Sequence, residues 1–587
     1  MKRLLILLGV LCVAAVVAPG QENVVTIDVL PFVCDKAGTY RLAKDLSAVD
    51  SGILILSNDV VIDLGGHTLT YGTGEKRNDK VITYNSLQSG NVGHHAVYVT
   101  SDPRRSKDAP VPAGWNYRFT GVVIRNGRIK TGGGGISYSD AIDVSGTVGC
   151  EITGLTIENA ARDSSAVIGG RQSRIHHCTI IDTNTHVSNR HAQLAVIVTG
   201  PDTEVSDCTI RGGAQVGIKA TSGAHIHHND IRHSATATNC YGIQGYGQKN
   251  VHAHHNLIIP TNGRGLHISE KSVGWRVHHN YIEARERANR EYPKGLDTHG
   301  IKMEGCRDAK VWGNVVVCES TTRGNPTPLN FSIQADSNNE VYGNVFVAKK
   351  VTPKERATAV YLVGGDGTGT VIRDNVFFSN DRMVEVYWEP GNNFTLRNCR
   401  FYPLAPEDKI TTFFFWNAKP ARGLKLLDCT FGPGVGATGY QFPDTKEDWS
   451  KDAEYTVGWT VTLRVTADGK PVPGAKVTAV TTKGVAGDAR VYTTDADGEV
   501  PIGTRQFTII FHSKDRTAVV ADDMPYSVKI DGGEAGSHAF EVTIGNTSQI
   551  DVDLKAKTHT VTPRKDEPAP DLDRIIAEAK AAAGAKP

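Results

Sequence analysis

A six-residue pattern recurs along most of the chain, with apolar residues at both ends and Asn or Cys at the fourth position. The fourth positions follow one another at intervals of roughly 27 residues, which is a solenoid period. Such a chain builds its core by stacking similar coils. The copies are ITGLTI (152–157, with Leu at the fourth position), IHHCTI (175–180), VSDCTI (205–210), IHHNDI (226–231), AHHNLI (253–258), VHHNYI (277–282), VWGNVV (311–316), VYGNVF (341–346), IRDNVF (372–377), LRNCRF (396–401) and LLDCTF (426–431).

Each coil is predicted to consist of short strands. A second apolar segment precedes five of the copies, as VGIKAT, YGIQGY, RGLHIS, HGIKME and FSIQAD. β-Branched residues and glycine dominate these segments, and helical periodicity is absent before the last residues. The fold class is therefore all-β.

The fourth position marks a corner. Apolar residues five apart cannot face the same side of one straight strand, so the chain must bend between them. Asn tolerates left-handed backbone, and identical amides stacked about 4.8 Å apart form a ladder. We expect Asn229, Asn256 and Asn280 to lie directly above one another.

These repeats, together with VVIDLGGHTLT (60–70), resemble the right-handed parallel β-helix of the pectin-lyase-like superfamily. The resemblance covers roughly residues 30–435 and implies a β-helix domain of about a dozen coils over residues 21–435. It implies that the strands on either side of the corner form the second and third sheets. The GIK-type strands then form the first sheet, where such proteins bind substrate. Calcium is a candidate cofactor by resemblance, although no carboxylate cluster identifies its ligands.

Two histidines precede the corner in three successive coils. His227, His254 and His278 form one predicted column, and His228, His255 and His279 form the next. The favoured interpretation is a structural stack. The alternative is a metal site, because neutral imidazoles suit Zn²⁺. Either way the histidines should lie on a different sheet from the GIK-type strands.

The nine cysteines beyond residue 20 leave at least one thiol unpaired. Cys178 with Cys208, and Cys399 with Cys429, occupy the corner position one coil apart. Their Cβ vectors should run parallel, so we expect free, buried thiols.

Alternation along the first sheet predicts a polar strip on its outward face. Such a strip suits a groove for a sugar polymer, and the alternative is an ordinary solvated face. The two outward columns comprise Lys219, Gln244, His267, Lys302, Gln334, Tyr361 and Glu385, and then Thr221, Tyr246, Ser269, Glu304, Asp336, Val363 and Tyr387.

Long predicted loops border this strip, and the loop at 283–299 brings Arg290, Asp297 and His299 to its rim. The mixture of charges favours a lyase that acts on an acidic, uronate-containing polysaccharide. In this hypothesis Lys302 is the base, Arg264 or Arg290 neutralises the carboxylate, and His267 or Tyr246 protonates the leaving oxygen.

Two other functions stay open. A hydrolase would use paired carboxylates, either Glu304 with Asp336 or a wider pair that includes Asp297 or Glu270. A non-catalytic protein would bind carbohydrate on the same face. The motifs of the polygalacturonase-like hydrolases and the Arg-rich motif of the classical pectate lyases are both missing.

Residues 1–20 have the pattern of a secretory signal peptide, with Lys2 and Arg3 before an apolar run that is too short to span a membrane. We expect a secreted protein, extracellular or periplasmic, and a monomer. The formal net charge of +1 argues against a nucleic-acid partner.

A linker is predicted at 436–454. DGKPVPGAKV and TTDADGEV, within 455–556, resemble the prealbumin-like β-sandwich of carboxypeptidase-regulatory-like domains. Residues 557–587 are predicted to be a flexible tail with a short helix capped by Asp571.

Overall fold

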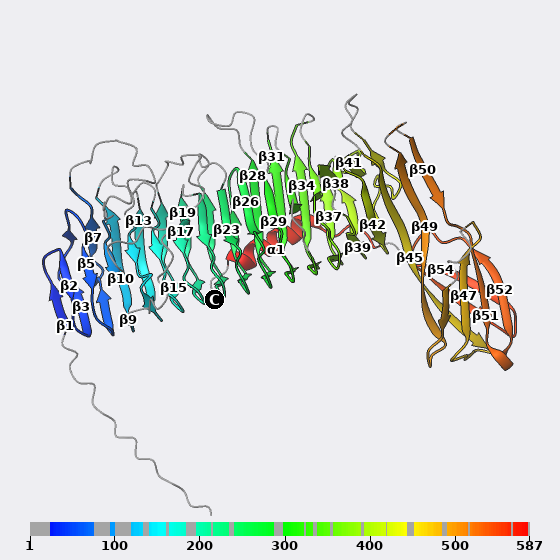
Figure 1. The fold of residues 1–587 in the computed structure, drawn as a ribbon, viewed down its shortest axis with the longest axis horizontal. Helices are drawn as coiled ribbons and strands as arrows, with labels where there is room; N and C mark the ends of the chain where they lie inside the picture. The colour runs from blue at the N-terminus through cyan, green and yellow to red at the C-terminus, as the bar shows by residue number, and fades with distance from the viewer. Residues whose placement is uncertain are drawn as a thin grey trace, which may run out of the picture.

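The computed structural model of the chain shows an elongated stack of short strands with a second β-module at its C-terminal end (Figure 1). Within the described residues, no helix is long and apolar enough to cross a membrane. The structure describes residues 24–74, 94–99, 119–132, 140–159, 164–182, 195–212, 215–233, 240–286, 298–321, 325–332, 337–352, 356–388, 392–417, 419–442, 451–483, 490–512, 514, 517–564 and 567–584.

One face of the stack is a parallel sheet of 15 described strands, each from a different coil. Its apolar residues pair in register, so that Ile243 lies beside Ile218 and Leu266. All three are fully buried, as predicted for the inward face. The strands are β2 (Phe32–Cys34), β5 (Ile53–Ile55), β8 (Val97–Val99), β11 (Ile142–Asp143), β14 (Val167–Ile168), β17 (Ala195–Val198), β20 (Val216–Lys219), β23 (Cys240–Tyr246), β26 (Gly263–Ser269), β29 (His299–Glu304), β32 (Thr327–Ser332), β35 (Thr358–Val363), β38 (Arg382–Trp388), β41 (Thr411–Asn417) and β44 (Tyr440–Gln441).

The strands on either side of each corner also stack in parallel, coil upon coil. Those before the corner are β15 (Arg174–His176), β18 (Glu204–Ser206), β21 (His225–His227), β24 (His252–His254), β27 (Arg276–His278), β30 (Lys310–Trp312), β33 (Glu340–Tyr342), β36 (Val371–Arg373), β39 (Thr395–Arg397) and β42 (Ala421–Leu427). Those after it are β16 (Thr179–Asp182), β19 (Thr209–Gly212), β22 (Asp230–His233), β25 (Leu257–Ile259), β28 (Tyr281–Glu286), β31 (Val315–Ser320), β34 (Val345–Lys350), β37 (Val376–Ser379), β40 (Arg400–Pro403) and β43 (Thr430–Phe431). The N-terminal coils contribute β1 (Val24–Ile27), β3 (Gly38–Leu42), β4 (Leu46–Ser47), β6 (Val60–Asp63), β7 (Thr68–Tyr71), β9 (Phe119–Thr120), β10 (Val123–Thr131), β12 (Thr147–Val148) and β13 (Glu151–Asn159).

The predicted asparagine ladder is confirmed. The side-chain amide of Asn229 donates to Oδ1 of Asn256 at 3.0 Å, and that of Asn256 donates to Oδ1 of Asn280 at 3.0 Å. The same amides also donate to backbone carbonyls, and all three side chains are buried. The ladder thus satisfies its own buried polar atoms and fixes each coil relative to the next.

The left-handed residue of the corner is not the Asn, as the sequence suggests, but the residue before it. His228, His255 and His279 have φ values of 54°, 52° and 52°. Gly313, Gly343 and Asp374 take the same conformation in later coils. Gly, Asn, Asp and His tolerate this region best, which explains why these types occupy the position.

The thiols at the corner are free, as expected. Cys178 and Cys208 are buried and unbridged, as are Cys399 and Cys429. Their Sγ atoms lie near backbone carbonyls of the coil before, so they replace the asparagine amide at the ends of the ladder.

A column of glycines in successive strands interrupts the inward–outward alternation of side chains in the 15-stranded sheet. A Cβ on Gly217 would lie 2.7 Å from the carbonyl oxygen of Gly242, and one on Gly242 would lie 2.5 Å from that of Gly265. Val216 and Tyr241, just before these glycines, pack in an apolar cluster outside the main core. The residue before each glycine therefore lies on the outward face.

The C-terminal module consists of strands and contains no long helix in its described part. Its longest strand pairs in parallel with β42, so the module continues a sheet of the solenoid. Tyr440 and Gln441, assigned to a linker from the sequence, form β44 and pair with β41. One sheet contains β45 (Ala453–Ala467), β46 (Lys470–Pro471), β49 (Glu499–His512), β50 (Thr517–Asp522), β53 (Ser548–Asp553) and β54 (Thr558–Pro563), and the other contains β47 (Lys476–Thr481), β48 (Arg490–Thr493), β51 (Tyr526–Asp531) and β52 (Ser537–Val542), with a 3-10 turn at Gly533–Ala535.

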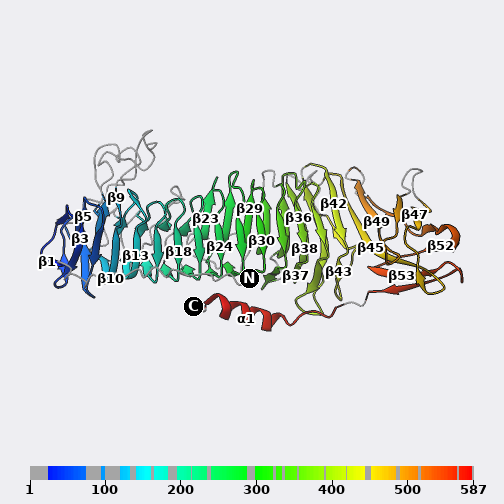
Figure 2. The same ribbon diagram turned by 90° about the horizontal axis from the view of Figure 1, so that it is seen from below.

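The chain then runs back along the solenoid and ends in helix α1 (Leu572–Gly584), as Figure 2 shows. Asp571 caps it by accepting a hydrogen bond from the backbone N–H of Arg574 at 3.0 Å. The sequence predicts a flexible tail here, whereas the helix packs on β25, β28 and β31. Ala583 is buried there against an apolar patch that includes Leu257 and Tyr281.

Candidate functional site

The outward face of the 15-stranded sheet brings together polar side chains from successive coils. Parallel pairing places Gln244 beside Lys219, His267 beside Gln244, and Lys302 beside His267. Two residues further along each strand, Tyr246, Ser269 and Glu304 form the second column. The predicted register of these coils is therefore confirmed.

The register of the next coil differs from the prediction. Asn330 lies beside Lys302 and Ser332 beside Glu304, in the places predicted for Gln334 and Asp336. The strand begins four residues earlier than FSIQAD suggests, and an even shift leaves the alternation unchanged. The sequence pattern could not distinguish the two registers. Gln334 and Asp336 themselves lie outside the described residues.

Glu304 is the centre of a partly buried ionic cluster. Its Oε2 accepts hydrogen bonds from Nε2 of His267 at 2.9 Å and from Nζ of Lys302 at 2.8 Å. The bond from His267 is the main cause that lowers the pKa of Glu304 to about 2; burial opposes this shift, and the bond from Lys302 adds to it. Glu304 is therefore ionised at any physiological pH.

His267 is held neutral and in one orientation. Burial lowers its pKa to about 4, although the bond to Glu304 acts in the opposite direction. Because Nε2 donates to Glu304, Nδ1 carries the lone pair, and the side-chain amide of Gln244 approaches it at 3.4 Å. We call Gln244, Tyr246, His267, Lys302 and Glu304 the polar cluster.

Two tyrosines flank the His267 ring. Tyr241 stacks on it with centroids 5.5 Å apart, and the guanidinium of Arg264 lies 5.0 Å above Tyr241 and donates to its hydroxyl. Tyr246 meets the ring edge-on, and its hydroxyl accepts a hydrogen bond of 2.6 Å from Gln244. Burial raises the pKa of Tyr246 to about 12, so it stays protonated.

A second pair extends the polar cluster toward β32. The Asn330 amide lies 3.3 Å from Nε2 of His299, and both side chains are buried. Burial holds the pKa of His299 well below its ordinary value. Among the described residues, no hydrogen-bond partner meets Nδ1 of His299, Oδ1 of Asn330 or Oε1 of Gln244. Three polar atoms on this face thus have bonding capacity left over.

Aromatic rings continue the same face over β35, β38 and β41. The rings of Tyr361 and Tyr387 lie 5.6 Å apart, and Trp416 meets Tyr387 edge-on at 5.8 Å. Beneath them Glu385 is fully buried and accepts hydrogen bonds from Thr358 at 2.7 Å and Arg382 at 3.1 Å. The face therefore combines an ionic centre with a row of rings, which suits a chain of sugar units.

The remaining predicted site residues lie outside the polar cluster. Lys219 is half-buried at the end of β20, and Glu270 is exposed at the left-handed turn after β26. Arg290 and Asp297 lie outside the described residues. Sequence reasoning missed Tyr241 and Asn330, because it assumed unbroken alternation for the first and the wrong register for the second.

At the polar cluster, the described residues gather no set of calcium ligands. Nearer the N-terminal end of the same sheet, His95, Asp140 and Asp143 bring two carboxylates and an imidazole together, and Asp143 lies in the outward column that contains Lys219. Each carboxylate already accepts a backbone hydrogen bond, from Ser165 at 2.6 Å and from Ser145 at 3.0 Å. These bonds explain the group as part of turn structure.

Comparisons with known proteins bear on the fold. The family model described as right handed beta helix region matches residues 140–305, which include the polar cluster. This match, together with the parallel strand stacks, supports a right-handed parallel β-helix. A search of curated proteins finds no match to the chain.

Similar solved structures include tailspike proteins of the E. coli bacteriophage HK620. The tailspike in complex with a pentasaccharide is 11% identical, with 85% of this chain and 86% of that chain covered and a TM-score of 0.31. A variant in complex with a hexasaccharide is 11% identical, with 83% and 86% covered and a TM-score of 0.33. TM-scores this low establish neither a shared fold nor a shared activity.

Proposed function

We propose that this protein is an exported carbohydrate-active β-helix protein that cleaves an acidic, uronate-containing polysaccharide by β-elimination. The observation that carries the proposal is the polar cluster: a cation, an oriented neutral imidazole and a protonated phenol lie side by side on an outward sheet face. Export is supported by the signal-like sequence of residues 1–20. N-terminal sequencing of the protein recovered outside the cytoplasm tests that part.

The structure favours a different division of roles from the one that the sequence suggests. Lys302 is paired with an ionised carboxylate, which favours its charged form and disfavours it as a base. We therefore assign Lys302, with Arg264 nearby, to neutralising the uronate carboxylate. His267 is the better base, because it is neutral and oriented by Glu304.

β-Elimination transfers one proton from the substrate to the protein and one proton from the protein to the leaving group. His267 takes the proton on the carbon next to the substrate carboxylate, and the released electron pair forms a carbon–carbon double bond. The bond from the neighbouring carbon to the glycosidic oxygen breaks, and that oxygen takes a proton from Tyr246. Neutralising the carboxylate makes the first proton acidic enough to remove, and placing all groups on one rigid sheet holds them in position.

Hydrolysis is less well supported by the described residues. It needs two carboxyl groups about 5 to 10 Å apart across the sugar. Glu385 is too far from Glu304, because β38 is three strands away from β29 at about 4.8 Å per strand. Of the predicted partners of Glu304, Asp297 and Asp336 lie outside the described residues. Glu270 lies beside Glu304, with its backbone N–H donating to the Glu304 carbonyl at 3.1 Å, but it is exposed and lacks the burial that a general acid of this kind needs.

Incubation of the purified protein with a panel of uronic-acid polymers tests the proposal. Elimination creates an unsaturated sugar end that absorbs ultraviolet light, and we expect this signal from the wild type. H267Q and K302M should lower the rate by a factor of about 100 or more. K310M is the matched control, because Lys310 is exposed on a different sheet and pairs only with Glu340 among described acidic residues.

Each other outcome has a clear meaning. New reducing ends without the ultraviolet signal would establish hydrolysis instead. Binding of the polymer without cleavage, if K302M weakens it and K310M does not, would establish a binding protein. Equal rates for the wild type, H267Q and K302M would remove the polar cluster from the reaction.

A further inference from the structure

The histidines before the corners form a three-column array on β21, β24 and β27. His225 and His252 form the first column, and their rings stack 4.8 Å apart. His227, His254 and His278 form the second, with stacked rings 5.0 Å and 4.9 Å apart. His228, His255 and His279 form the third, at spacings of 5.2 Å. We call these eight residues the histidine array. Stacking is confirmed, as is their location away from the 15-stranded sheet.

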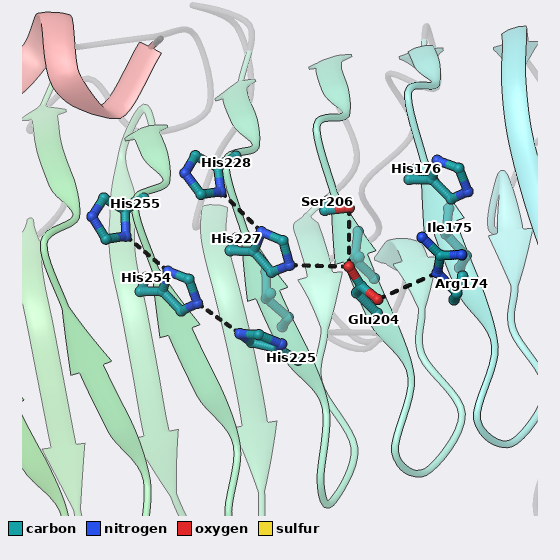
Figure 3. A network of polar contacts seen from close by, with 12 residues as sticks. Arg174, Ile175, His176, Glu204, Ser206, His225, His227, His228, His254 and His255 are labelled. Carbon is teal, nitrogen blue, oxygen red and sulfur yellow. Dashed lines mark hydrogen bonds and ion pairs between the residues drawn. The ribbon is translucent and has the colours of Figure 1, made fainter. Parts of the chain in front are cut away.

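Stacking alone does not account for the directions of the nitrogens. Nε2 of His225 and Nε2 of His254 face each other at 2.6 Å, as Figure 3 shows. His252 and His278 repeat this contact one coil later, also at 2.6 Å. One nitrogen each from His225, His252 and His254 lies within 4.8 Å of the other two. Three imidazole nitrogens therefore converge from two adjacent strands.

We propose that His225, His252 and His254 form a surface site for a transition-metal ion of the zinc, nickel or copper class. Tetrahedral zinc holds its ligand nitrogens about 2.0–2.1 Å from the ion and so about 3.3 Å from one another. To reach this geometry the rings of His225 and His254 separate slightly, and the ring of His252, which stacks on His225 and whose Nε2 faces His278 at 2.6 Å, turns toward them. All three side chains are half-buried, so the ion can enter from solvent, and water completes its coordination.

The chemistry of the ligands selects this class of metal. Imidazole nitrogen suits zinc, nickel and copper, whereas calcium and magnesium require oxygen ligands.

The array has definite ends, which limits the number of sites. Arg276 lies beside His252 where the first column would continue, and Lys310 follows it. A second site one coil later would need a histidine at the position of Arg276. The cation there supplies no ligand and repels a metal ion. At the other end Glu204 accepts a hydrogen bond of 3.2 Å from His227 and is engaged by Arg174 at 3.4 Å. We therefore expect one ion per chain.

Two neighbouring residues, His255 and Asn256, hold the ligand His254 in place. His254 Nδ1 lies 2.8 Å from Nδ1 of His255, which fixes the ring so that Nε2 faces the site. Partners of this kind orient metal-binding imidazoles in proteins. The ladder amide of Asn256 holds the backbone of the same coil by bonding to the carbonyl of His254 at 3.0 Å. The site is thus built directly beside the asparagine ladder.

Calorimetric titration of the untagged chain with Zn²⁺ at pH 7.5 tests the proposal, with Ca²⁺ titrated in parallel. We expect one Zn²⁺ per chain and no response to Ca²⁺. H252Q should weaken Zn²⁺ binding by about tenfold or more, whereas H559Q, which changes an exposed histidine of β54, should leave it unchanged. Circular dichroism checks that both variants are folded.

Substitution with Co²⁺ gives a second measurement on the wild-type protein. A site with three imidazoles and water produces visible absorption bands of low-coordinate cobalt, and we expect H225Q to abolish them. Zn²⁺ binding that is equal in the wild type, H252Q and H225Q would overturn the proposal, as would the absence of Zn²⁺ binding at millimolar concentration. The test is independent of glycan cleavage, because the array and the polar cluster lie on different sheets.

Discussion

At the residue scale, the most consequential groups are polar side chains that are buried and paired. Asn256 donates to two backbone carbonyls and to Asn280, and its Oδ1 accepts from Asn229. On the 15-stranded sheet, the buried His267 is paired with the half-buried Glu304. Removing one partner leaves the other without a bond, which costs more free energy than the bond itself contributes.

Asn256→Ala should lower the free energy of unfolding by about 2–4 kcal/mol, because the carbonyls of Ile226 and His254 and the backbone N–H of Asn229 lose the hydrogen bonds that Asn256 makes with them. Asn256→Cys is the matched control, since the chain places Cys at the same position in four other coils. We expect it to lose clearly less stability. Thermal unfolding of the three proteins measures this, and an equal loss in both variants would contradict a role of the ladder in stability.

Acid should destabilise the protein through His267. Burial lowers its pKa in the folded state from 6.5 to about 4. The unfolded chain therefore takes up a proton first, so the stability is fully present above pH 6.5 and is lost as the pH falls toward 4. Between pH 7 and 4.5 the loss from this group is about 2–3 kcal/mol. Glu304, whose pKa is lowered to about 2, acts in the same direction only below about pH 4.5.

H267Q removes this titrating group, and because it also removes the bond that lowers the pKa of Glu304, the comparison is made at pH 4.5 and above. Unfolding free energies at pH 7, 5.5 and 4.5 should fall more steeply for the wild type than for H267Q. Parallel pH profiles would show that burial of the neutral imidazole does not control the acid sensitivity.

At the scale of elements, the sequence predicts where the strands lie, but it predicts the residue register between neighbouring strands only in part. The period of the corner pattern and the alternation around Ile243 fix the columns, because both are repeated in every coil. The register of β32 could not be predicted, since a shift of four residues leaves Leu329, Phe331 and their alternation equally suitable. The outward position of Tyr241 depends on the glycine that follows it, which local alternation does not reveal.

Helix α1 illustrates a contact that no local pattern reports. Nζ of Lys580 donates to Glu283 at 2.8 Å, across 297 positions of sequence. The helix itself is recognisable from its alanines and its Asp571 cap, but its docking on β25, β28 and β31 depends on the patch formed by Leu257, Tyr281 and Val315. That patch exists only after the coils have stacked.

Truncation after Pro563 should expose this patch. We expect a lower melting temperature and increased binding of a hydrophobic dye, because buried apolar surface becomes exposed to water. K580M is the control: Glu283 keeps its ion pair with Arg285 and its bond from Tyr281, so the change should stay below about 1 kcal/mol. A truncated protein as stable as the full chain would show that the helix contributes nothing to the solenoid.

At the scale of the whole molecule, the solenoid separates its surfaces by sheet. The polar cluster and the aromatic row follow the 15-stranded sheet, the histidine array lies before the corners, and α1 covers the strands after them. Each coil adds one residue to each column, so a surface extends along the molecule rather than around a single pocket. The C-terminal module joins this arrangement directly, because β45 pairs with β42.

The asparagine ladder has a consequence for how such a protein changes its length. Every rung from Asn229 to Asn375 presents the same amide to the coil on either side, so neighbouring rungs are interchangeable. Duplication or loss of a whole coil in the gene would leave the line of amides unbroken. Evolution can therefore lengthen or shorten the surface that meets a polymer by whole steps, without having to redesign the interior.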